Sequence, residues 1–194
     1  FRKMLRFTAF LAFPAMFGLA MVAHEFIVVL VSEKWVGSIL LLRILCVSGA
    51  FLPFYTLYQN LIISRGKSDI YMVCTIALIV LQIGLMMVCY AKGIVFMVSV
   101  YSVVSVLWLF VWQYFAHRAI GVRLLDVMLD ICPYLFITLA VMSATYFLTI
   151  SVSNLIILLL LRIVLAAVLY FMVMKLCGSK MLAECMEYLR GKKG

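Results

Sequence analysis

The sequence predicts an all-α membrane protein with six transmembrane helices, and two observations carry this prediction. First, 69% of the 194 residues are Ala, Val, Ile, Leu, Met, Phe, Trp, Tyr or Cys, and only 12% are charged, which is too few to cover a soluble domain. Second, the apolar residues form six continuous runs, and roughly 20 apolar residues in a helix cross a hydrocarbon core about 30 Å thick. A membrane β-barrel would instead show alternating polarity in segments of about 10 residues.

We expect the spans at residues 7–31, 36–63, 70–91, 94–115, 133–150 and 155–174. Pro14 and Pro53 lie inside the first two spans. A proline within a helix removes one backbone hydrogen bond and clashes with the preceding turn, so each of these spans should kink there. Membrane proteins tolerate such kinks when neighbouring helices or water satisfy the freed carbonyl group.

Two amphipathic stretches flank the last pair of spans, at residues 119–132 and 179–190. Each combines an apolar stripe at helical spacing with a charged opposite face, which is typical of a short helix lying in the membrane interface. For the second stretch, a solvated tail is an equally good interpretation.

Basic residues indicate the orientation of the spans. Twelve Lys and Arg residues of the connections and termini fall on one side of the predicted membrane, and only Lys34 and Lys92 fall on the other. Since basic residues concentrate in cytoplasmic loops, both termini are expected in the cytoplasm. The net charge of +9 then faces the anionic inner leaflet, so it gives no reason to expect a nucleic-acid partner.

No motif of the sequence predicts an enzyme, a metal site or a cofactor site. Gly66-Lys67-Ser68 is similar to the end of a phosphate-binding loop, but Leu61 stands where that motif needs glycine. His24 and His117 fall near opposite faces of the membrane and cannot share a metal.

Three ionisable residues remain inside the predicted spans: Glu25, Arg43 and Arg162. At 1.5 Å of rise per residue, all three should lie about 10 Å below the outer membrane boundary. A charge at the bilayer centre costs about 2.5–3.5 kcal/mol on insertion scales, so such residues normally face a cavity or a partner. Two structural alternatives stay open: both arginines could extend outward along their own helices, and Glu25 could form a static pair with Arg43 across the turn at 33–35.

The functional hypothesis is a patch of two arginines, partly neutralised by one acidic residue, in a water-filled cavity open to the outer leaflet. Arginine suits phosphate because its planar guanidinium donates two hydrogen bonds at once. His24 projects about 100° away from Glu25 around the helix and is expected to be a packing residue rather than a proton carrier.

Residues 13–46 contain a series of features in a distinctive order: Pro14, Gly18-Leu19, Ala23 with an acidic residue shortly after, Trp35, Leu42 and Ile44-Leu45. After another span comes a small basic turn, Ser64-Arg65-Gly66-Lys67. In order and spacing, this stretch resembles the bacterial polysaccharide (Wzx-like) flippases of the multidrug/oligosaccharidyl-lipid/polysaccharide exporter superfamily. Many of those proteins have glycine shortly before the Trp35 position, where this chain has Ser32-Glu33-Lys34, and the last two spans match only in hydropathy.

The resemblance implies export of a lipid-linked oligosaccharide, for a surface polysaccharide such as lipopolysaccharide or capsule, by alternating access between two lobes. Members of the family have twelve to fourteen spans, so this six-span chain is expected to be the C-terminal lobe, with a missing N-terminal lobe as its partner. The expected substrate is a polyprenyl-diphosphate-linked sugar unit, and Glu25, Arg43 and Arg162 are the candidates to contact the diphosphate or couple to an ion.

Two alternatives belong to other classes. One is a six-span integral membrane enzyme or assembly subunit of envelope polysaccharide synthesis, which the short outer loops disfavour because such enzymes usually carry reactive residues on sizeable external loops. The other is a complete six-span carrier that works as a homodimer.

Overall fold

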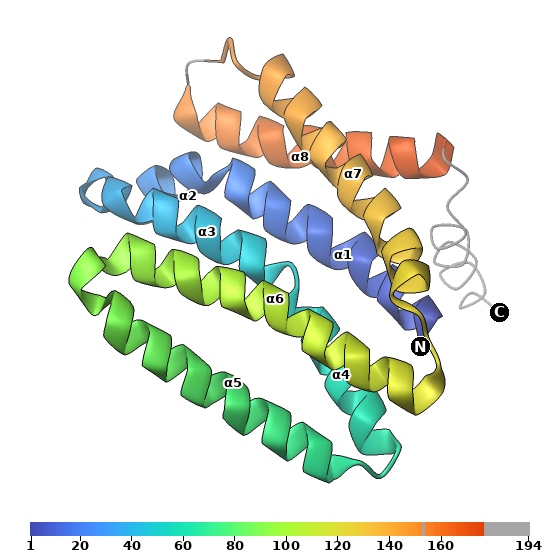
Figure 1. Ribbon diagram of the computed structural model, residues 1–194. Coiled ribbons are helices and arrows are strands. Elements are labelled where there is room, and N and C mark those ends of the chain that lie inside the picture. The colour runs from blue at the N-terminus through green and yellow to red at the C-terminus, as the bar shows by residue number, and fades with distance from the viewer. Residues whose placement is uncertain (153, 177–194) are drawn as a thin grey trace, which may run out of the picture.

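The computed structural model describes residues 1–152 and 154–176, and within these ranges the chain consists of helices joined by short turns, without a β-strand (Figure 1). Six helical stretches are long and apolar enough to cross a membrane, which confirms the predicted all-α, six-span class. The elements are α1 (Arg2–Met21), α2 (Ala23–Leu30), η1 (Glu33–Ser38), α3 (Ile39–Gly49), α4 (Leu52–Ser64), α5 (Ser68–Cys89), η2 (Tyr90–Lys92), α6 (Ile94–Ile120), α7 (Leu124–Leu148) and α8 (Leu155–Leu176).

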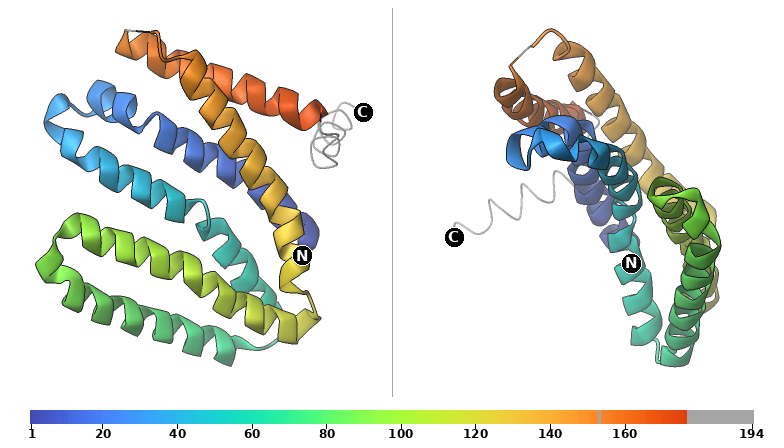
Figure 2. Two further views of the ribbon diagram at one scale, coloured as in Figure 1. Left: turned by 45° about the horizontal axis from the view of Figure 1, so that its top comes forward. Right: turned by 90° about the vertical axis from the view of Figure 1, so that its left-hand side faces the viewer.

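The helices lie side by side in an elongated array, with α8 at one edge and α5 at the other (Figures 1 and 2). From the α8 edge, α7 packs on α8, α1 on α7, α3 on α1, and α6 on both α3 and α4, while α5 covers α6. Each of the six spans reverses direction relative to the one before, so the start of α1 and the end of α8 lie at the same end of the molecule.

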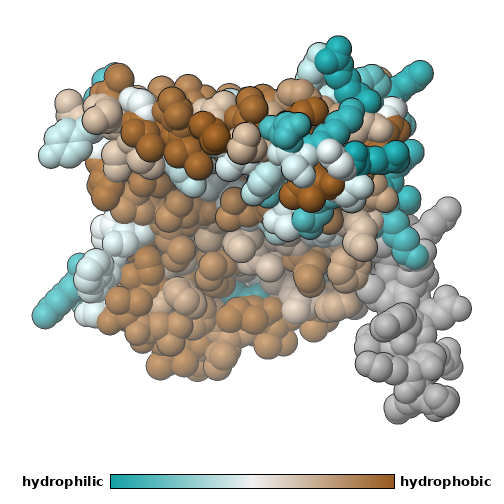
Figure 3. All heavy atoms as spheres, turned by 90° about the horizontal axis from the view of Figure 1, so that it is seen from below, coloured by the Kyte–Doolittle hydropathy of each residue, from teal (hydrophilic) through white to brown (hydrophobic). Residues whose placement is uncertain are grey.

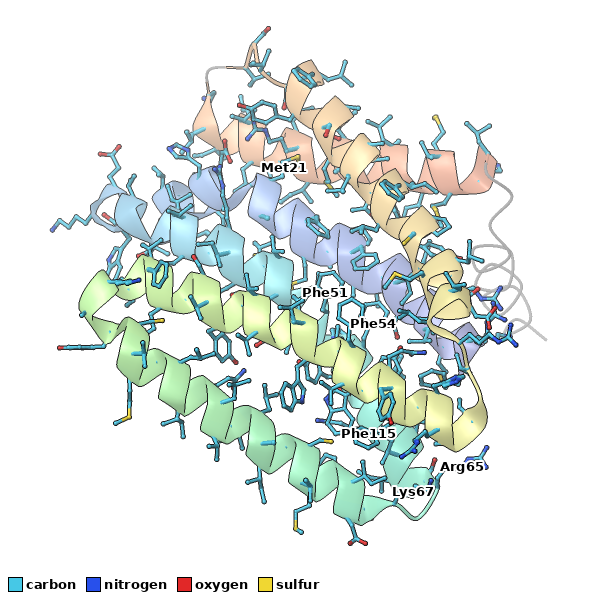
Figure 4. The ribbon with its side chains drawn as sticks, in the orientation of Figure 1. Met21, Phe51, Phe54, Arg65, Lys67 and Phe115 are labelled. Atoms are coloured by element: carbon cyan, nitrogen blue, oxygen red, sulfur yellow. The ribbon has the colours of Figure 1, made fainter. Side chains whose placement is uncertain are left out.

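The two ends of the array differ in charge. One end, here called the basic end, contains the start of α1, the turns at 65–67 and 121–123, and the end of α8 (Figure 1). The other end, here called the η end, contains η1 and η2 with Lys34 and Lys92. Figure 4 labels Arg65 and Lys67 in the α4–α5 turn of the basic end. The basic residues that the sequence groups together are therefore also together in space, within the described part of the chain.

Between these ends the surface is apolar, as lipid requires. Figure 3 shows one largely hydrophobic face, with hydrophilic residues gathered toward its ends. Large hydrophobic side chains are exposed on many helices, among them Met87 (79%), Val88 (77%) and Leu125 (73%). A soluble protein rarely exposes a continuous apolar surface of this kind, whereas a bilayer solvates it.

In the first span, the helix continues through its proline. Helix α1 continues through Pro14 and ends only at Met21, and the interruption comes at Val22, where φ is −90° and ψ is 10°. Pro14 has no N–H to offer the carbonyl oxygen of Phe10, and Tyr170 of α8 satisfies that oxygen with a hydrogen bond of 2.9 Å from its hydroxyl group. A neighbouring helix therefore stabilises the helix at the site where a kink was expected.

The second span does break near its proline. Helix α3 ends at Gly49 and α4 begins at Leu52, so Pro53 stands in the first turn of α4, where a missing N–H costs little. Phe51 and Phe54 lie at this break, and both rings pack against Phe13 of α1 at centroid distances of 5.7 Å (Figure 4).

The expected interfacial helix at 119–132 is wrong as a separate element. Helix α6 extends to Ile120, and α7 runs without interruption from Leu124 through Pro133 to Leu148. The reason lies in α1: Arg2 and Arg6 form ion pairs with Asp126 and Asp130, so the charged face of the stretch points into the protein. Its apolar face is the outward one. The second amphipathic stretch, 179–190, lies outside the described residues.

Candidate functional site

Glu25 of α2 and Arg162 of α8 form a buried ion pair near the η end. The Nη1 atom of Arg162 donates to Oε1 of Glu25 at 2.6 Å, and the two residues are only 5% and 6% exposed. They are 137 positions apart in the sequence. Two of the three ionisable residues that the sequence singled out are thus brought together by the fold.

The end of α7 holds the Arg162 side chain from a second side. Its Nε atom donates to the hydroxyl oxygen of Thr149 at 3.1 Å, and its guanidinium lies 5.1 Å from the centroid of the Tyr146 ring. The Thr149 hydroxyl in turn donates to the carbonyl oxygen of Thr145 at 2.8 Å, which leaves its lone pair for the arginine. The guanidinium is therefore fixed by a carboxylate, a hydroxyl group and an aromatic face.

The position of Arg162 follows from the spacing of α8. Arg162, Ala166, Tyr170 and Met174 are buried at intervals of four residues, which places them on one face of the helix. This face packs toward α1 and α7. Leu158, one interval earlier, is buried as well, so Arg162 lies within a packed stripe and points inward.

One oxygen of Glu25 has no partner. Oε2 is buried without a hydrogen bond, whereas Oε1 is bound to Arg162. His24 lies next to it, with Nδ1 at 4.0 Å from Oε1, and its side chain is 47% exposed. His24 is therefore half exposed among the described residues, and its role as a packing residue rather than a proton carrier stays a prediction. The carboxylate of Glu25 keeps one oxygen that can accept from a further donor.

An apolar groove between α1 and α8 begins at Arg162. This α1–α8 groove has a volume of about 430 Å³ and is lined by Phe10, Leu11, Pro14, Ala15, Gly18, Leu19, Met21, Val22, Phe26, Met142, Arg162, Ile163, Ala166, Ala167, Tyr170 and Phe171. Along α1 the lining extends from Phe10 to Val22, which is about 18 Å at 1.5 Å per residue. Among the described residues, Arg162 is the one charged side chain of the lining. The groove has the shape and polarity for an extended hydrocarbon chain.

Arg43 lies apart from the pair. Its side chain is exposed on α3, and within residues 1–152 and 154–176 it forms no hydrogen bond or ion pair. The alternative in which Glu25 pairs with Arg43 is wrong, because α2 presents Glu25 to α8 and Arg162 takes its oxygen. The alternative in which Arg162 extends outward to the surface is wrong as well, since its guanidinium is held inside.

Sequence reasoning missed Thr149, Tyr146 and Tyr170. The hydroxyl of Thr149 and the ring of Tyr146 position Arg162, and Tyr170 closes the other end of the groove. The sequence does contain one signal for Tyr170: it lies two four-residue steps after Arg162, and therefore on the same face of the helix. No group of three His, Cys, Asp or Glu side chains that could hold a metal ion occurs in the part of the chain that the structure describes.

Comparison with known proteins connects the chain to polysaccharide biosynthesis. A family model described as "Polysaccharide biosynthesis protein" matches residues 1–40, which include Glu25. An "Uncharacterized membrane protein in cps region" of Klebsiella pneumoniae is 29% identical over 70 residues, which are 36% of this chain and 14% of that relative. These matches confirm the resemblance stated from the sequence, at the level of a multi-pass bacterial inner-membrane protein of polysaccharide biosynthesis.

The match covers only a small part of the relative. Since the same 70 residues make up 36% of this chain and 14% of the other, the relative is roughly 2.5 times longer. No solved structure matches the chain.

Proposed function

We propose that the chain forms the C-terminal lobe of a flippase that moves a polyprenyl-diphosphate-linked oligosaccharide across the bacterial cytoplasmic membrane, for export of a surface polysaccharide such as lipopolysaccharide or capsule. The observation that carries the proposal is the position of Arg162. It is the one charged residue of an apolar groove, and it is held at the end of that groove by Glu25 and Thr149. A polyprenyl diphosphate has the matching chemistry, an apolar chain that ends in an anion.

The ion pair is the resting state of this proposed site. With Glu25 bound, Arg162 is neutralised and is stable in a region without water. A diphosphate competes with Glu25 because it offers the guanidinium more oxygens in bidentate geometry. Glu25, released from the arginine and adjacent to His24, then couples substrate binding to an ion. We propose that no bond is made or broken, so the protein is a transporter and not an enzyme.

The exposure of Arg43 favours the presence of a second lobe. An exposed arginine inside a span costs up to about 2.5–3.5 kcal/mol against lipid, so water or a partner is expected beside it. We propose that an N-terminal lobe forms the opposite wall of an aqueous cavity at Arg43, and the greater length of the Klebsiella relative is in keeping with this. The basic end is placed in the cytoplasm, because basic residues concentrate there.

The test is export in cells that depend on the complete reading frame containing this chain. Arg162→Gln and Arg43→Gln should each abolish surface polysaccharide. Arg43→Gln should leave the amount of protein in the membrane near that of the unchanged protein, and export by Arg162→Gln, which also breaks a buried ion pair, is compared per amount of protein in the membrane. Arg162→Lys should restore export only in part, since lysine keeps the charge and loses the two-pronged geometry.

The matched control is Arg65→Gln, which removes the same charge from the exposed α4–α5 turn and should export normally. Normal export by both Arg162→Gln and Arg43→Gln would overturn the proposed site. Export by the six-span chain expressed alone would show that two copies supply both walls.

A further inference from the structure

A second pocket lies at the basic end, where α6 meets α7, at the opposite end of the molecule from the Glu25–Arg162 pair. This α6–α7 pocket has a volume of about 530 Å³. Its polar lining includes His117, Arg123 and Gln113, and its apolar lining includes Phe110, Tyr114 and Leu125. Nothing in the proposed flippase mechanism uses it.

Hydrogen bonds fix the polar part of this pocket. The carbonyl oxygen of Val122 accepts from Nε2 of Gln113 at 3.0 Å and lies 3.1 Å from Nδ1 of His117. A carbonyl oxygen can only accept, so Nδ1 of His117 carries the hydrogen and Nε2 is left for another contact. Gln113 is anchored from below by the buried hydroxyl of Tyr58, which donates to Oε1 at 2.6 Å. The turn is thus preorganised around His117.

Arg123 provides a positive charge at the pocket. Within residues 1–152 and 154–176, neither Arg123 nor His117 forms an ion pair. The acid nearest in sequence, Asp126, is committed to Arg2 of α1, with an N–O distance of 3.8 Å. Arg118 adds a further positive charge, with its guanidinium 5.5 Å from the centroid of the Tyr114 ring. The pocket therefore offers an uncompensated positive site.

An apolar wall continues from the charges toward the middle of the membrane. Phe110 and Tyr114 precede His117 on α6 and are 48% and 54% exposed, and Leu125 on α7 is 73% exposed. From His117 to Phe110 the helix rises about 10 Å. A ligand bound here would place an anion at the interface and a hydrocarbon chain along the helices. A free phosphate would leave this wall without a function.

We propose that the α6–α7 pocket binds one acidic glycerophospholipid of the surrounding bilayer, with its phosphate at Arg123 and His117 and an acyl chain against Phe110 and Tyr114. The lipid ties the end of α6 to the start of α7. This inference does not depend on the proposed transport function, because it rests on other residues at the other end of the molecule.

The test is native mass spectrometry of the full-length protein, purified in detergent with equal amounts of phosphatidylglycerol and phosphatidylcholine. We expect the unchanged protein to retain one phosphatidylglycerol in preference to phosphatidylcholine. Arg123→Gln should lower this preference about fivefold, as expected for one basic residue near an anionic lipid. Arg123→Lys should keep most of it.

The matched control is Arg65→Gln at the same end of the molecule, outside the pocket (Figure 4). It should retain phosphatidylglycerol as the unchanged protein does, and an equal loss in both variants would show general surface attraction and overturn the site. Soluble glycerol phosphate in excess should fail to displace the lipid; displacement would show that the pocket recognises the phosphate alone. Melting temperatures in detergent micelles that contain phosphatidylcholine verify that the variants are folded. If Arg123→Gln does not fold, His117→Gln provides a second variant, with a smaller expected loss of preference.

Discussion

Ion pairs connect the first span to the last two helices at both ends of the molecule: α2 to α8 at the η end, and α1 to α7 at the basic end. The two pairs lie in different environments. At the η end, Glu25 and Arg162 are nearly fully buried, and their closest atoms are 2.6 Å apart. At the basic end, Arg2 donates from Nε to Asp130 at 2.6 Å and from Nη2 at 3.2 Å, and its side chain is 45% exposed. The distances are alike, and the access to water is not.

Because the two ion pairs differ in their access to water, breaking them should have different effects on stability. At the basic end only Asp130 is buried, and water reaches the half-exposed guanidinium of Arg2, so this pair is expected to contribute less to stability. A buried pair has given up its hydration, so each partner depends on the other. The η-end pair is therefore the one whose rearrangement by an incoming anion changes the free energy of the protein most, which is what a substrate-coupled site requires.

The largest expected effect comes from removing one partner of the buried pair. Arg162→Gln or Glu25→Gln should lower the free energy of unfolding by about 3–5 kcal/mol, because the remaining charge is left buried without a counter-ion. The double change should be milder than either single change, since no unpaired charge remains. Reversible unfolding in detergent or bilayer discs measures all three variants.

Arg43→Gln is the control for this comparison. Arg43 is predicted at the same depth in the membrane as Arg162, but it is exposed and has no partner among the described residues. Its removal should therefore change the stability little. Equal losses of stability for Arg43→Gln and Arg162→Gln would show that the buried pair has no special weight.

An intermediate effect is expected at Tyr170, which lies between the two ends on the face of α8 that carries Arg162. Its hydroxyl group satisfies the Phe10 carbonyl that Pro14 leaves without a partner. Tyr170→Phe should lower the free energy of unfolding by about 0.6 kcal/mol, the average for hydrogen bonds between membrane helices, and by no more than about 1.7 kcal/mol, the largest value.

Tyr134→Phe is the matched control for Tyr170→Phe. Tyr134 is also buried, packs on Phe10 with its ring, and makes no hydrogen bond through its hydroxyl group in the described residues. In a Pro14→Ala background, the new backbone N–H at this position can donate to the Phe10 carbonyl, so Tyr170→Phe should cost less stability there. An equal loss of stability in both backgrounds would contradict the role proposed for the Tyr170 hydroxyl.

The sequence was sufficient for the fold class and for part of the site. Six apolar runs fix the number of spans because composition and length decide membrane insertion, and the rarity of charges within those runs singles out Glu25, Arg43 and Arg162. Which of these meet could not be predicted, since Glu25 and Arg162 are 137 residues apart and only the packing of α2 on α8 joins them. Sequence proximity favoured Arg43, which is the wrong partner.

The other differences have the same cause, a distant helix that changes a local preference. At Pro14 the missing donor is replaced by Tyr170 of α8, and the interruption of the helix falls at Val22, where no proline or glycine marks it. The amphipathic stretch before Pro133 predicts an interfacial helix, but Arg2 and Arg6 of α1 draw its aspartates inward. Local propensity could not anticipate either contact.

The smallest effect is expected at the basic end, and its dependence on salt distinguishes it from the buried pair. Arg2→Gln removes the two hydrogen bonds to Asp130 and the weaker pairing with Asp126 at 3.8 Å. The loss of stability should be smaller than for Arg162→Gln, because Arg6 remains 3.6 Å from Asp130 and water reaches the site. Raising the salt concentration to 1 M, where the Debye length is about 3 Å, should shrink the Arg2→Gln effect further and leave the Arg162→Gln effect nearly unchanged. Unfolding free energies of both variants at low and high salt give the comparison directly. A strong salt dependence at Arg162 would mean that water reaches the buried pair, and the contrast between the two ends would then be lost.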